Sequence, residues 1–223
     1  MDKKLSNSDN CMVYYNSKDE YIGECMYKNI VIVHGIGGLH REMYFEHLKG
    51  LCEDLGLDVY MPSMGGYRDG VTYDTWREKF DREILPYIGK DTILVAQSMG
   101  TQFVVKYFAE KKINVGVYIS TAGPYNILDI KESMQEKGKL FEPVSITFAP
   151  TDEEREIFRN LDFPKYSFYT DNDTFFEEDN LSNYAIAIGS TARLLPGKAH
   201  FNMEDMLDGL KELEDMIKSF VTQ

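Results

Sequence analysis

Short apolar runs alternate with longer amphipathic stretches along most of this chain. The short runs are rich in β-branched and aromatic side chains and predict buried strands at residues 29–33, 57–61, 92–96, 115–120, 166–170 and 192–195. The longer stretches repeat apolar positions every three or four residues and predict helices at 42–55, 74–85, 100–111, 183–188 and 203–221. This alternation predicts an α/β fold: a three-layer α/β/α sandwich around a mostly parallel central sheet.

The stretch 124–165 fits this alternation less well. Residues 127–137 are helix-like, and the sequence TDEE at 151–154 opens a further helix with a capping box. Residues 144–148 fit either a strand or an extended connection. We therefore expect this stretch to form a partial lid, because the chain is too short for a large cap domain.

The first 28 residues are polar and mixed, and we expect an irregular arm or a hairpin that pairs residues 12–15 with 21–26. At 223 residues the whole chain, 1–223, suits a single domain with one well-buried core. No apolar run approaches the roughly 18 residues of a membrane span, and no apolar region follows Lys3 and Lys4 to make a secretion signal.

Charge and cysteine content exclude further classes of function. The formal net charge of -13 argues against a nucleic-acid partner, because phosphate contacts need clustered lysine and arginine. The three cysteines cannot all pair within the chain and show no CxxC spacing, so a reduced, cytoplasmic setting is expected. The sequence carries no signal for an oligomeric state.

The segment 92–101 (TILVAQSMGT) carries the strongest chemical signal. An apolar strand runs into small-x-Ser-x-Gly and then into a helix, which is the order of a nucleophile elbow. The tight turn needs small residues two positions before and after Ser98, and Ala96 and Gly100 meet that need. The helix N-terminus, including the N–H of Met99, would then face developing negative charge. The competing interpretation is a serine that caps an ordinary helix.

A glycine-rich turn at 34–38 (HGIGG) follows an early strand, where enzymes with such an elbow place the other half of the oxyanion hole. The N–H of Ile36 is the predicted donor, paired with that of Met99. A dinucleotide site would need G-x-G-x-x-G, but His40 stands at its last position. A phosphate loop needs Gly-Lys-Ser/Thr, and that triplet does not occur in the chain. No cofactor is expected.

His200 is the predicted base among four histidines. It lies in a loop between the last predicted strand and the closing helix, at the edge of a parallel sheet where ligands bind. His34 belongs to the glycine turn, His40 follows it, and His47 is expected on the surface of a helix. The chain order serine, acid, histidine is the one used by α/β-hydrolases.

The acid is expected in the loop that follows the strand predicted at 166–170, which offers Asp171 and Asp173. It would hold the imidazole in one tautomer and stabilise the cation that forms when the serine loses its proton. Asp171 lies at the turn itself, where such residues are common as caps, which favours Asp173 and leaves Asp171 as the alternative. A calcium loop is excluded, because Phe175 and Phe176 replace an oxygen ligand and a required glycine. No metal is expected.

Taken in order, the HGxGG turn, the xxSMG elbow, the TDND loop and the LLPGKAHF segment resemble the small serine hydrolases of the retinoblastoma-binding protein nine type, a branch of the α/β-hydrolase superfamily. The likeness spans about residues 29 to 221, and 124–165 lies outside it. The family loop usually reads acid-Asp-Pro with the last aspartate catalytic, so the resemblance places that role on Asp173, with Thr174 replacing proline. Three other positions depart from the family pattern without removing a reacting group: Ala96, Gln97 and Ala199.

These residues predict a carboxylesterase-like serine hydrolase with a Ser98, Asp173 and His200 triad. Its partner would be a small-molecule acyl substrate, namely an ester, thioester or amide. Aromatic side chains predicted on or near loops at the site would suit a small apolar acyl chain: Tyr67, Tyr73, Trp76, Tyr125, Phe141, Phe175 and Phe176. The alternative function is a catalytically weak α/β-hydrolase-fold binding protein.

Overall fold

A computed structural model of the protein describes residues 13–15, 21–23, 26–37, 43–201 and 210–222. At its centre lies a six-stranded sheet in which every neighbouring pair of strands is parallel. In spatial order the strands are β4 (Asp58–Tyr60), β3 (Asn29–Val33), β5 (Thr92–Gln97), β6 (Val117–Thr121), β7 (Lys165–Tyr169) and β8 (Thr191–Leu194). All six predicted strands are therefore confirmed, with β3 matching at both ends and the others differing by at most two residues at either end.

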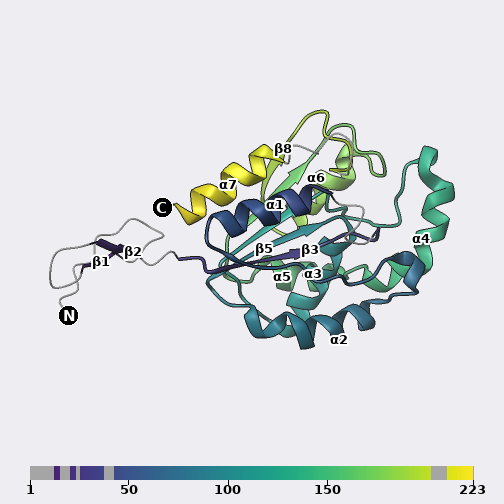
Figure 1. The fold of residues 1–223 in the computed structure, drawn as a ribbon. Helices are drawn as coiled ribbons and strands as arrows, with labels where there is room; N and C mark the ends of the chain where they lie inside the picture. Colours follow the sequence, from purple (N-terminus) through teal and green to yellow (C-terminus); the bar gives the residue numbers. More distant parts are fainter. Residues whose placement is uncertain (1–12, 16–20, 24–25, 38–42, 202–209, 223) are drawn as a thin grey trace.

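Helices cover both faces of the sheet, as Figure 1 shows. One face packs against α1 (Met43–Asp54) and α7 (Lys211–Val221). The other packs against α2 (Tyr73–Glu83), α3 (Met99–Lys111), α5 (Asp152–Arg159) and α6 (Glu178–Ala187). Strand β3 explains how one strand serves both layers: Ile30 and Ile32 face the first layer while Val31 and Val33 face the second, the alternation that a pleated strand imposes. The predicted three-layer sandwich is confirmed.

The two layers differ in their side chains. The α1 and α7 layer is largely aliphatic, whereas the other is built around aromatic rings that meet edge to face. Trp76 and Phe80 on α2 contact Phe103 on α3, and all three are fully buried. Edge-to-face pairs stabilise the fold beyond the burial of the rings themselves, so they strengthen the packing of α2 against α3.

The order of the strands places two loops side by side. From β3 the chain moves outward to β4 and then returns to the other side of β3 to form β5. This reversal is a topological switch point, and ligands of open α/β sheets bind beside it, at the carboxyl ends of the strands. Val33 pairs in register with Ala96, so the turns that follow β3 and β5 leave the sheet at the same level.

The segment between β6 and β7 differs from the sequence prediction. Residues 127–131 are not helical; a short 3₁₀ helix, η4 (Glu132–Met134), leads into α4 (Gln135–Phe148). The expectation of a strand or extended connection at 144–148 is wrong, because these residues form the last turn of α4. Val144 and Phe148, four positions apart, are both buried, and this helical burial outweighs the β propensity of the segment.

Several smaller predictions are also settled. Strands β1 (Val13–Tyr15) and β2 (Tyr21–Gly23) pair antiparallel, as the predicted hairpin requires. Thr72 caps α2, and Thr151 forms the predicted capping box at α5. Helix α6 begins five residues before the predicted start at 183. The predicted helix at 203–221 is confirmed from 211 onward, while residues 202–209 lie outside the described part of the chain.

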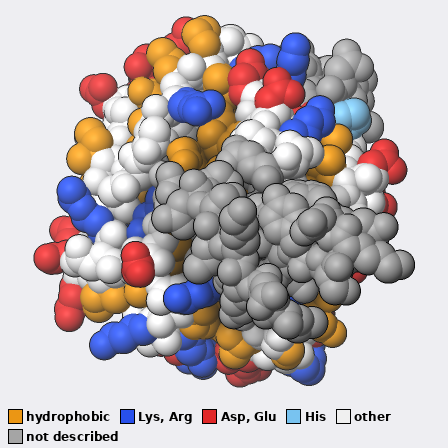
Figure 2. Space-filling view, turned by 90° about the vertical axis from the view of Figure 1, so that its left-hand side faces the viewer, with side chains coloured by type: hydrophobic (Ala, Val, Ile, Leu, Met, Phe, Trp, Pro, Cys, Tyr) orange, Lys and Arg blue, Asp and Glu red, His pale blue; other side chains and the backbone are white. Residues whose placement is uncertain are grey.

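Acidic and basic side chains are interspersed over the described part of the face in Figure 2. Apolar side chains lie between them. The described part of this face shows neither one continuous basic patch nor one continuous apolar patch. Among the helices that the structure describes, none combines the length and apolar character needed to cross a membrane.

Candidate active site

Ser98 lies on a strained turn between β5 and α3. Its backbone angles, φ 49° and ψ -121°, belong to a region that residues other than glycine rarely adopt. The turn is held from both sides, because the Ser98 N–H donates to Thr121 O at 3.0 Å and the Thr101 hydroxyl donates to Ser98 O at 2.6 Å. The Ser98 side chain makes no capping hydrogen bond to α3, so the interpretation as an ordinary helix cap is wrong.

The structure brings the three predicted catalytic side chains together from three separate segments. His200 Nε2 lies 2.9 Å from Ser98 Oγ, and His200 Nδ1 lies 2.7 Å from Asp173 Oδ2. An ionised carboxylate only accepts hydrogen bonds, so Nδ1 carries the imidazole proton and Nε2 is left to accept from the serine hydroxyl. All three residues are buried, with exposed fractions of 7% for Ser98, 5% for His200 and 2% for Asp173.

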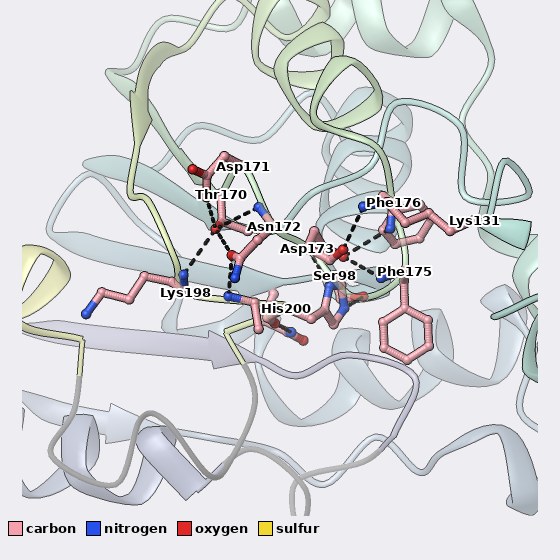
Figure 3. Close-up of polar contacts among 12 residues, drawn as sticks. Ser98, Lys131, Thr170, Asp171, Asn172, Asp173, Phe175, Phe176, Lys198 and His200 are labelled. Atoms are coloured by element: carbon pink, nitrogen blue, oxygen red, sulfur yellow. Dashed lines mark hydrogen bonds and ion pairs between the residues drawn. The ribbon is translucent and has the colours of Figure 1, made fainter. Parts of the chain in front are cut away.

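Asp173 is held by backbone donors as well as by the imidazole. Its Oδ1 accepts from the N–H of Phe175 at 2.7 Å and of Phe176 at 3.0 Å, which leaves Oδ2 for His200. The ammonium of Lys131 donates to the carbonyl of Asp173 at 3.0 Å and pairs with Glu177. These contacts fix the direction of the carboxylate, as Figure 3 shows.

Three other residues of the TDND loop (170–173) accept hydrogen bonds from the backbone of the segment that carries His200. We call this segment, residues 195–201, the histidine loop. Asp171 Oδ1 accepts from the N–H of Gly197 at 2.9 Å, and Asn172 Oδ1 accepts from the N–H of Ala199 at 2.9 Å. The hydroxyl oxygen of Thr170 accepts from the N–H of Lys198 at 3.2 Å. Asp171, the alternative acid, is thus committed to the backbone of the histidine loop, and Asp173 alone of the two contacts His200 (Figure 3). No pattern in the sequence predicts these loop contacts.

The turn after β3 is packed directly against the start of α3. A β-carbon on Gly100 would lie 2.5 Å from His34 O and 2.6 Å from Val33 O, so only glycine fits there. Met99 is the first residue of α3, where the N–H groups have no partner within the helix. Ile36 and Met99 both line the cavity in front of Ser98. The predicted oxyanion donors therefore lie at the same cavity; Gly38 and His40 lie outside the described residues.

The other described histidines take structural positions. His34 is fully buried; its Nε2 accepts from the N–H of Met64 at 2.8 Å, and its Nδ1 lies 2.7 Å from Gly35 O. One neutral tautomer satisfies both contacts, so His34 ties the loop at 61–67 to the glycine turn. His47 is exposed and faces Glu214 on α7, as expected for a surface position.

Among the described residues, Cys52 carries a free thiol, but its surroundings oppose ionisation. It is fully buried between α1 and the sheet. Burial, with smaller contributions from Glu214 and Glu53, raises the pKa of its thiol to about 12. Since the thiolate is the nucleophilic form, Cys52 is unreactive at neutral pH.

A small cavity of about 90 Å³ opens in front of Ser98 and His200. Its wall is mostly apolar, and four of the aromatic residues expected near the site line it: Tyr67, Phe141, Phe175 and Phe176. Phe175 also meets the His200 ring edge to face at 4.8 Å. Tyr73 and Trp76 belong instead to the buried aromatic layer, and Tyr125 packs against Arg155 away from the cavity.

Helix α4 and the loop before it supply the far wall of this cavity. Ile127, Ile130, Phe141 and Ser145 all line it, so the segment 124–165 does border the site, as the expectation of a partial lid requires. Of these four residues, Phe141 alone is among those predicted from the sequence to lie near the site. The apolar character of the segment was visible in the sequence, but its helical placement over Ser98 was not.

No protein-family model matches the chain, and a comparison with curated protein sequences gave no match. Solved structures do match. The ydeN gene product of B. subtilis superposes with a TM-score of 0.70 at 15% identity, over 88% of this chain and 100% of that one. A carboxylesterase from Nitrososphaera gargenis gives 0.58 at 16% identity, over 98% and 97%. The thioesterase domain from the curacin biosynthetic pathway gives 0.60 at 12% identity, over 96% and 97%.

At these identities the likeness establishes the fold. The chain has the α/β-hydrolase fold, with a six-stranded parallel sheet in the described residues and no large cap domain among them. The narrower resemblance to the retinoblastoma-binding protein nine type stays a prediction.

Proposed function

We propose that this protein is a carboxylesterase-like serine hydrolase that cleaves a small ester, thioester or amide. The observation that carries the proposal is the continuous path from Ser98 Oγ to His200 Nε2 at 2.9 Å and from His200 Nδ1 to Asp173 Oδ2 at 2.7 Å. The names of the structural neighbours, a carboxylesterase and a thioesterase domain, support the same reaction class. The cysteine content favours a reduced, cytoplasmic setting.

The reaction would begin with attack of Ser98 Oγ on the acyl carbon. His200 Nε2 accepts the hydroxyl proton, and Asp173 stabilises the resulting imidazolium through Nδ1. The N–H groups of Ile36 and Met99 are the proposed donors to the oxyanion. His200 then gives its proton to the departing alcohol, thiol or amine, leaving an acyl group on Ser98.

Water would complete the cycle. His200 takes a proton from a water molecule, whose oxygen attacks the acyl carbon. The bond between the acyl carbon and Ser98 Oγ then breaks, His200 returns the proton to Oγ, and the acid is released. The strained turn at Ser98 and the backbone donors at Asp173 hold these groups in place before substrate arrives, so little reorganisation is required during the reaction.

The test is turnover of p-nitrophenyl acetate and p-nitrophenyl butyrate by the full chain. Ser98→Ala is expected to lower kcat by about four orders of magnitude or more, because the nucleophile is lost. Ser182→Ala, a change on the surface of α6, is the matched control and should retain wild-type kcat. Full activity of Ser98→Ala would contradict the role of Ser98.

A fluorophosphonate probe separates the enzyme from the alternative, a catalytically weak binding protein of the same fold. The probe should modify Ser98 in the wild type, as identified by peptide mass spectrometry, and the His200→Ala variant should lose this labelling. A wild-type protein that is neither labelled nor active on any ester would favour the binding-protein alternative.

A further inference from the structure

The cavity in front of Ser98 holds only part of an ester. At about 90 Å³ it is well below the 300–1,000 Å³ that pockets for small molecules usually reach. An ester, thioester or amide has an acyl side and a leaving-group side, and both extend from the carbon that Ser98 attacks. If one side fills the apolar cavity, the other must lie elsewhere along the surface.

A second hollow adjoins this cavity, and we call it the α4 groove. Its volume is about 240 Å³, and it shares three lining residues with the first cavity: Ile127, Ile130 and Ser145. The two spaces therefore adjoin at these side chains. A further hollow, beside Arg155 and Arg159, shares no lining residue with the cavity at Ser98.

The α4 groove follows one face of the helix. Gln135, Gly138, Lys139 and Glu142 line it and are spaced three or four positions apart, which places them on one side of an α-helix. Gly138 is buried in the middle of the helix, where glycine lowers helix stability relative to alanine. A β-carbon there would lie 3.1 Å from Ile130 Cδ1, so the glycine makes room for Ile130 to approach α4.

The two walls of the groove differ in chemistry. The loop contributes Ile127, Leu128 and Ile130, while the helix contributes amide, ammonium and carboxylate groups. Lys139 also pairs with Glu136 at 2.8 Å, so the groove presents both signs of charge and no strong net field. A long alkyl chain would leave the polar wall unused, and a strongly charged group would meet a like charge.

From these observations we infer that the α4 groove binds one arm of an elongated substrate, and that this arm is uncharged overall and carries hydrogen-bonding groups such as an amide or hydroxyl. This inference rests on the proposed function, since it assigns the second side of the ester that Ser98 attacks. It changes the expected substrate from a small apolar ester to a molecule with a short apolar side and a longer polar side.

The test compares four esters with methyl butyrate, which is short on both sides. Two of them carry an amide. In 2-acetamidoethyl butyrate the amide lies on the alcohol side of the ester, and in methyl 6-acetamidohexanoate it lies on the acyl side. Two are apolar counterparts of similar length, hexyl butyrate and methyl decanoate. The wild type should prefer the amide over its apolar counterpart on one of the two sides by about tenfold in kcat/KM, the value of one or two net hydrogen bonds.

Substitutions on α4 test whether the groove is the source of this preference for the amide ester. Gln135→Leu with Glu142→Leu should abolish it, while methyl butyrate changes by less than about twofold, because these residues do not line the first cavity. Gly138→Leu should lower turnover of the long amide ester by filling the groove. Lys137→Leu adds the same side chain to α4 outside the groove and serves as the control.

The outcomes are distinct. Two results would overturn the groove assignment while leaving the proposed hydrolase intact. One is equal kcat/KM for the amide and apolar esters on both sides, and the other is an equal loss of methyl butyrate turnover in the variant with Gln135→Leu and Glu142→Leu. If no ester is hydrolysed, the proposed function fails, and the groove is tested alone by methyl NMR with N-(2-hydroxyethyl)acetamide. Shifts at Ile130 that disappear in Gly138→Leu would support the groove, and unchanged spectra would overturn it.

A second inference comes from the hydrogen bonds of the TDND loop. The histidine loop has left-handed backbone at Gly197, Ala199 and Phe201, with φ of 74°, 45° and 51°. Two of these residues are not glycine, so the loop is strained on both sides of His200. Asn172 accepts from the N–H of Ala199, the residue directly before the imidazole, and also accepts from the Thr170 hydroxyl at 2.7 Å.

We propose that Asn172 is a positioning residue that holds His200 at hydrogen-bond distance from Ser98. Asn172→Ala should lower kcat about tenfold with little change in KM, because the imidazole is displaced while the substrate cavity, which Asn172 does not line, is unaltered. Asn172→Asp keeps an oxygen acceptor and should restore most of the activity.

The proton between His200 and Asp173 gives a readout besides activity. Its low-field NMR signal should broaden in Asn172→Ala and be retained in Asn172→Asp. A purely structural role would lower the melting temperature of Asn172→Ala but leave kcat and this signal unchanged at 25 °C, and that result would overturn the proposal. An equal loss of kcat in Asn172→Asp would do the same.

Discussion

The loops that carry Ser98, Asp173 and His200, which we call the reaction edge, and the α4 segment across the cavity are stabilised in different ways. Ser98, Asp173 and His200 lie on loops whose backbones are tied by short hydrogen bonds to one another and to the sheet. Across the cavity, α4 packs mainly through apolar contacts, such as those of Val144 and Phe148, although the loop before it is hydrogen-bonded to Asn180 and to the carbonyl of Phe175. The same segment leaves large apolar side chains in water, with Leu128 41%, Leu140 63% and Ile146 58% exposed.

Under the proposed function, the hydrogen-bonded loops would carry out the reaction and α4 would contribute to the choice of substrate. Backbone hydrogen bonds fix distances that the reaction needs and tolerate little variation. Apolar packing specifies shape less strictly, because side chains of similar volume can replace one another at modest cost. We therefore expect changes at the reaction edge to alter kcat, and changes in α4 to alter stability or substrate preference.

The largest expected effect distinguishes two aspartates in the same loop. Asp173→Asn should lower kcat about 10⁴-fold, because an amide favours the wrong imidazole tautomer. Asp171→Asn keeps an oxygen that accepts from the Gly197 N–H and should change kcat by less than about threefold. Steady-state kinetics on p-nitrophenyl acetate measures both. Comparable losses in the two variants would mean that the loop acts as one unit.

A second pair of variants concerns α4. Phe148→Ala should lower the free energy of unfolding by about 3–5 kcal/mol, since this fully buried ring contacts Trp76 and Phe103. Leu140→Ala removes an exposed side chain from the same helix and should change it by less than about 0.5 kcal/mol. Urea denaturation gives both values. A similar cost for the two would show that α4 does not pack as described.

A third prediction concerns the far layer, where α1 buries Cys52. The folded pKa of this thiol, about 12, lies above its ordinary value of 9.0, so its contribution to stability is complete below pH 9 and is lost as the pH rises towards 12. Between pH 9 and 10 the loss should be about 1 kcal/mol. Cys52→Ala should show a correspondingly shallower decline in urea midpoint over this interval. Identical slopes in the two proteins would refute the assignment.

The smallest expected effect lies where the chain leaves α4 and enters α5. The Thr151 hydroxyl oxygen accepts from the N–H of Glu154 at 3.2 Å, and the N–H of Thr151 donates to Glu154 Oε2 at 2.7 Å. Thr151→Ala should cost about 1 kcal/mol of unfolding free energy, and Thr151→Ser should cost little, because serine keeps the hydroxyl. Thermal unfolding of both variants checks the difference.

The sequence was most informative where function is encoded locally. Ser98 is flanked by residues that only a tight turn requires, and His200 and Asp173 are identified by their order and their position after strands. The structure places these three side chains in contact. The contacts of Asn172 were not foreseen, because they join loops 27 residues apart and no local pattern marks them.

The sequence was least informative for α4. Pro143 within the helix and the β-branched residues around it argue locally against a helix, yet the buried positions of Val144 and Phe148 select one. Contacts with α2 and α3 decide that outcome, and they depend on the whole fold. The start of α6 was missed for a related reason, since its N-cap Glu177 makes no side-chain capping bond.

The contact at Gly100 has a consequence for how this fold can change over evolution. The helix that follows Ser98 touches the carbonyls of Val33 and His34 through bare backbone at Gly100, with no side chain in between. A substitution cannot adjust that separation in small steps, since even one added carbon would collide. Diversification is therefore directed away from the junction of these two segments and towards the surfaces that surround it.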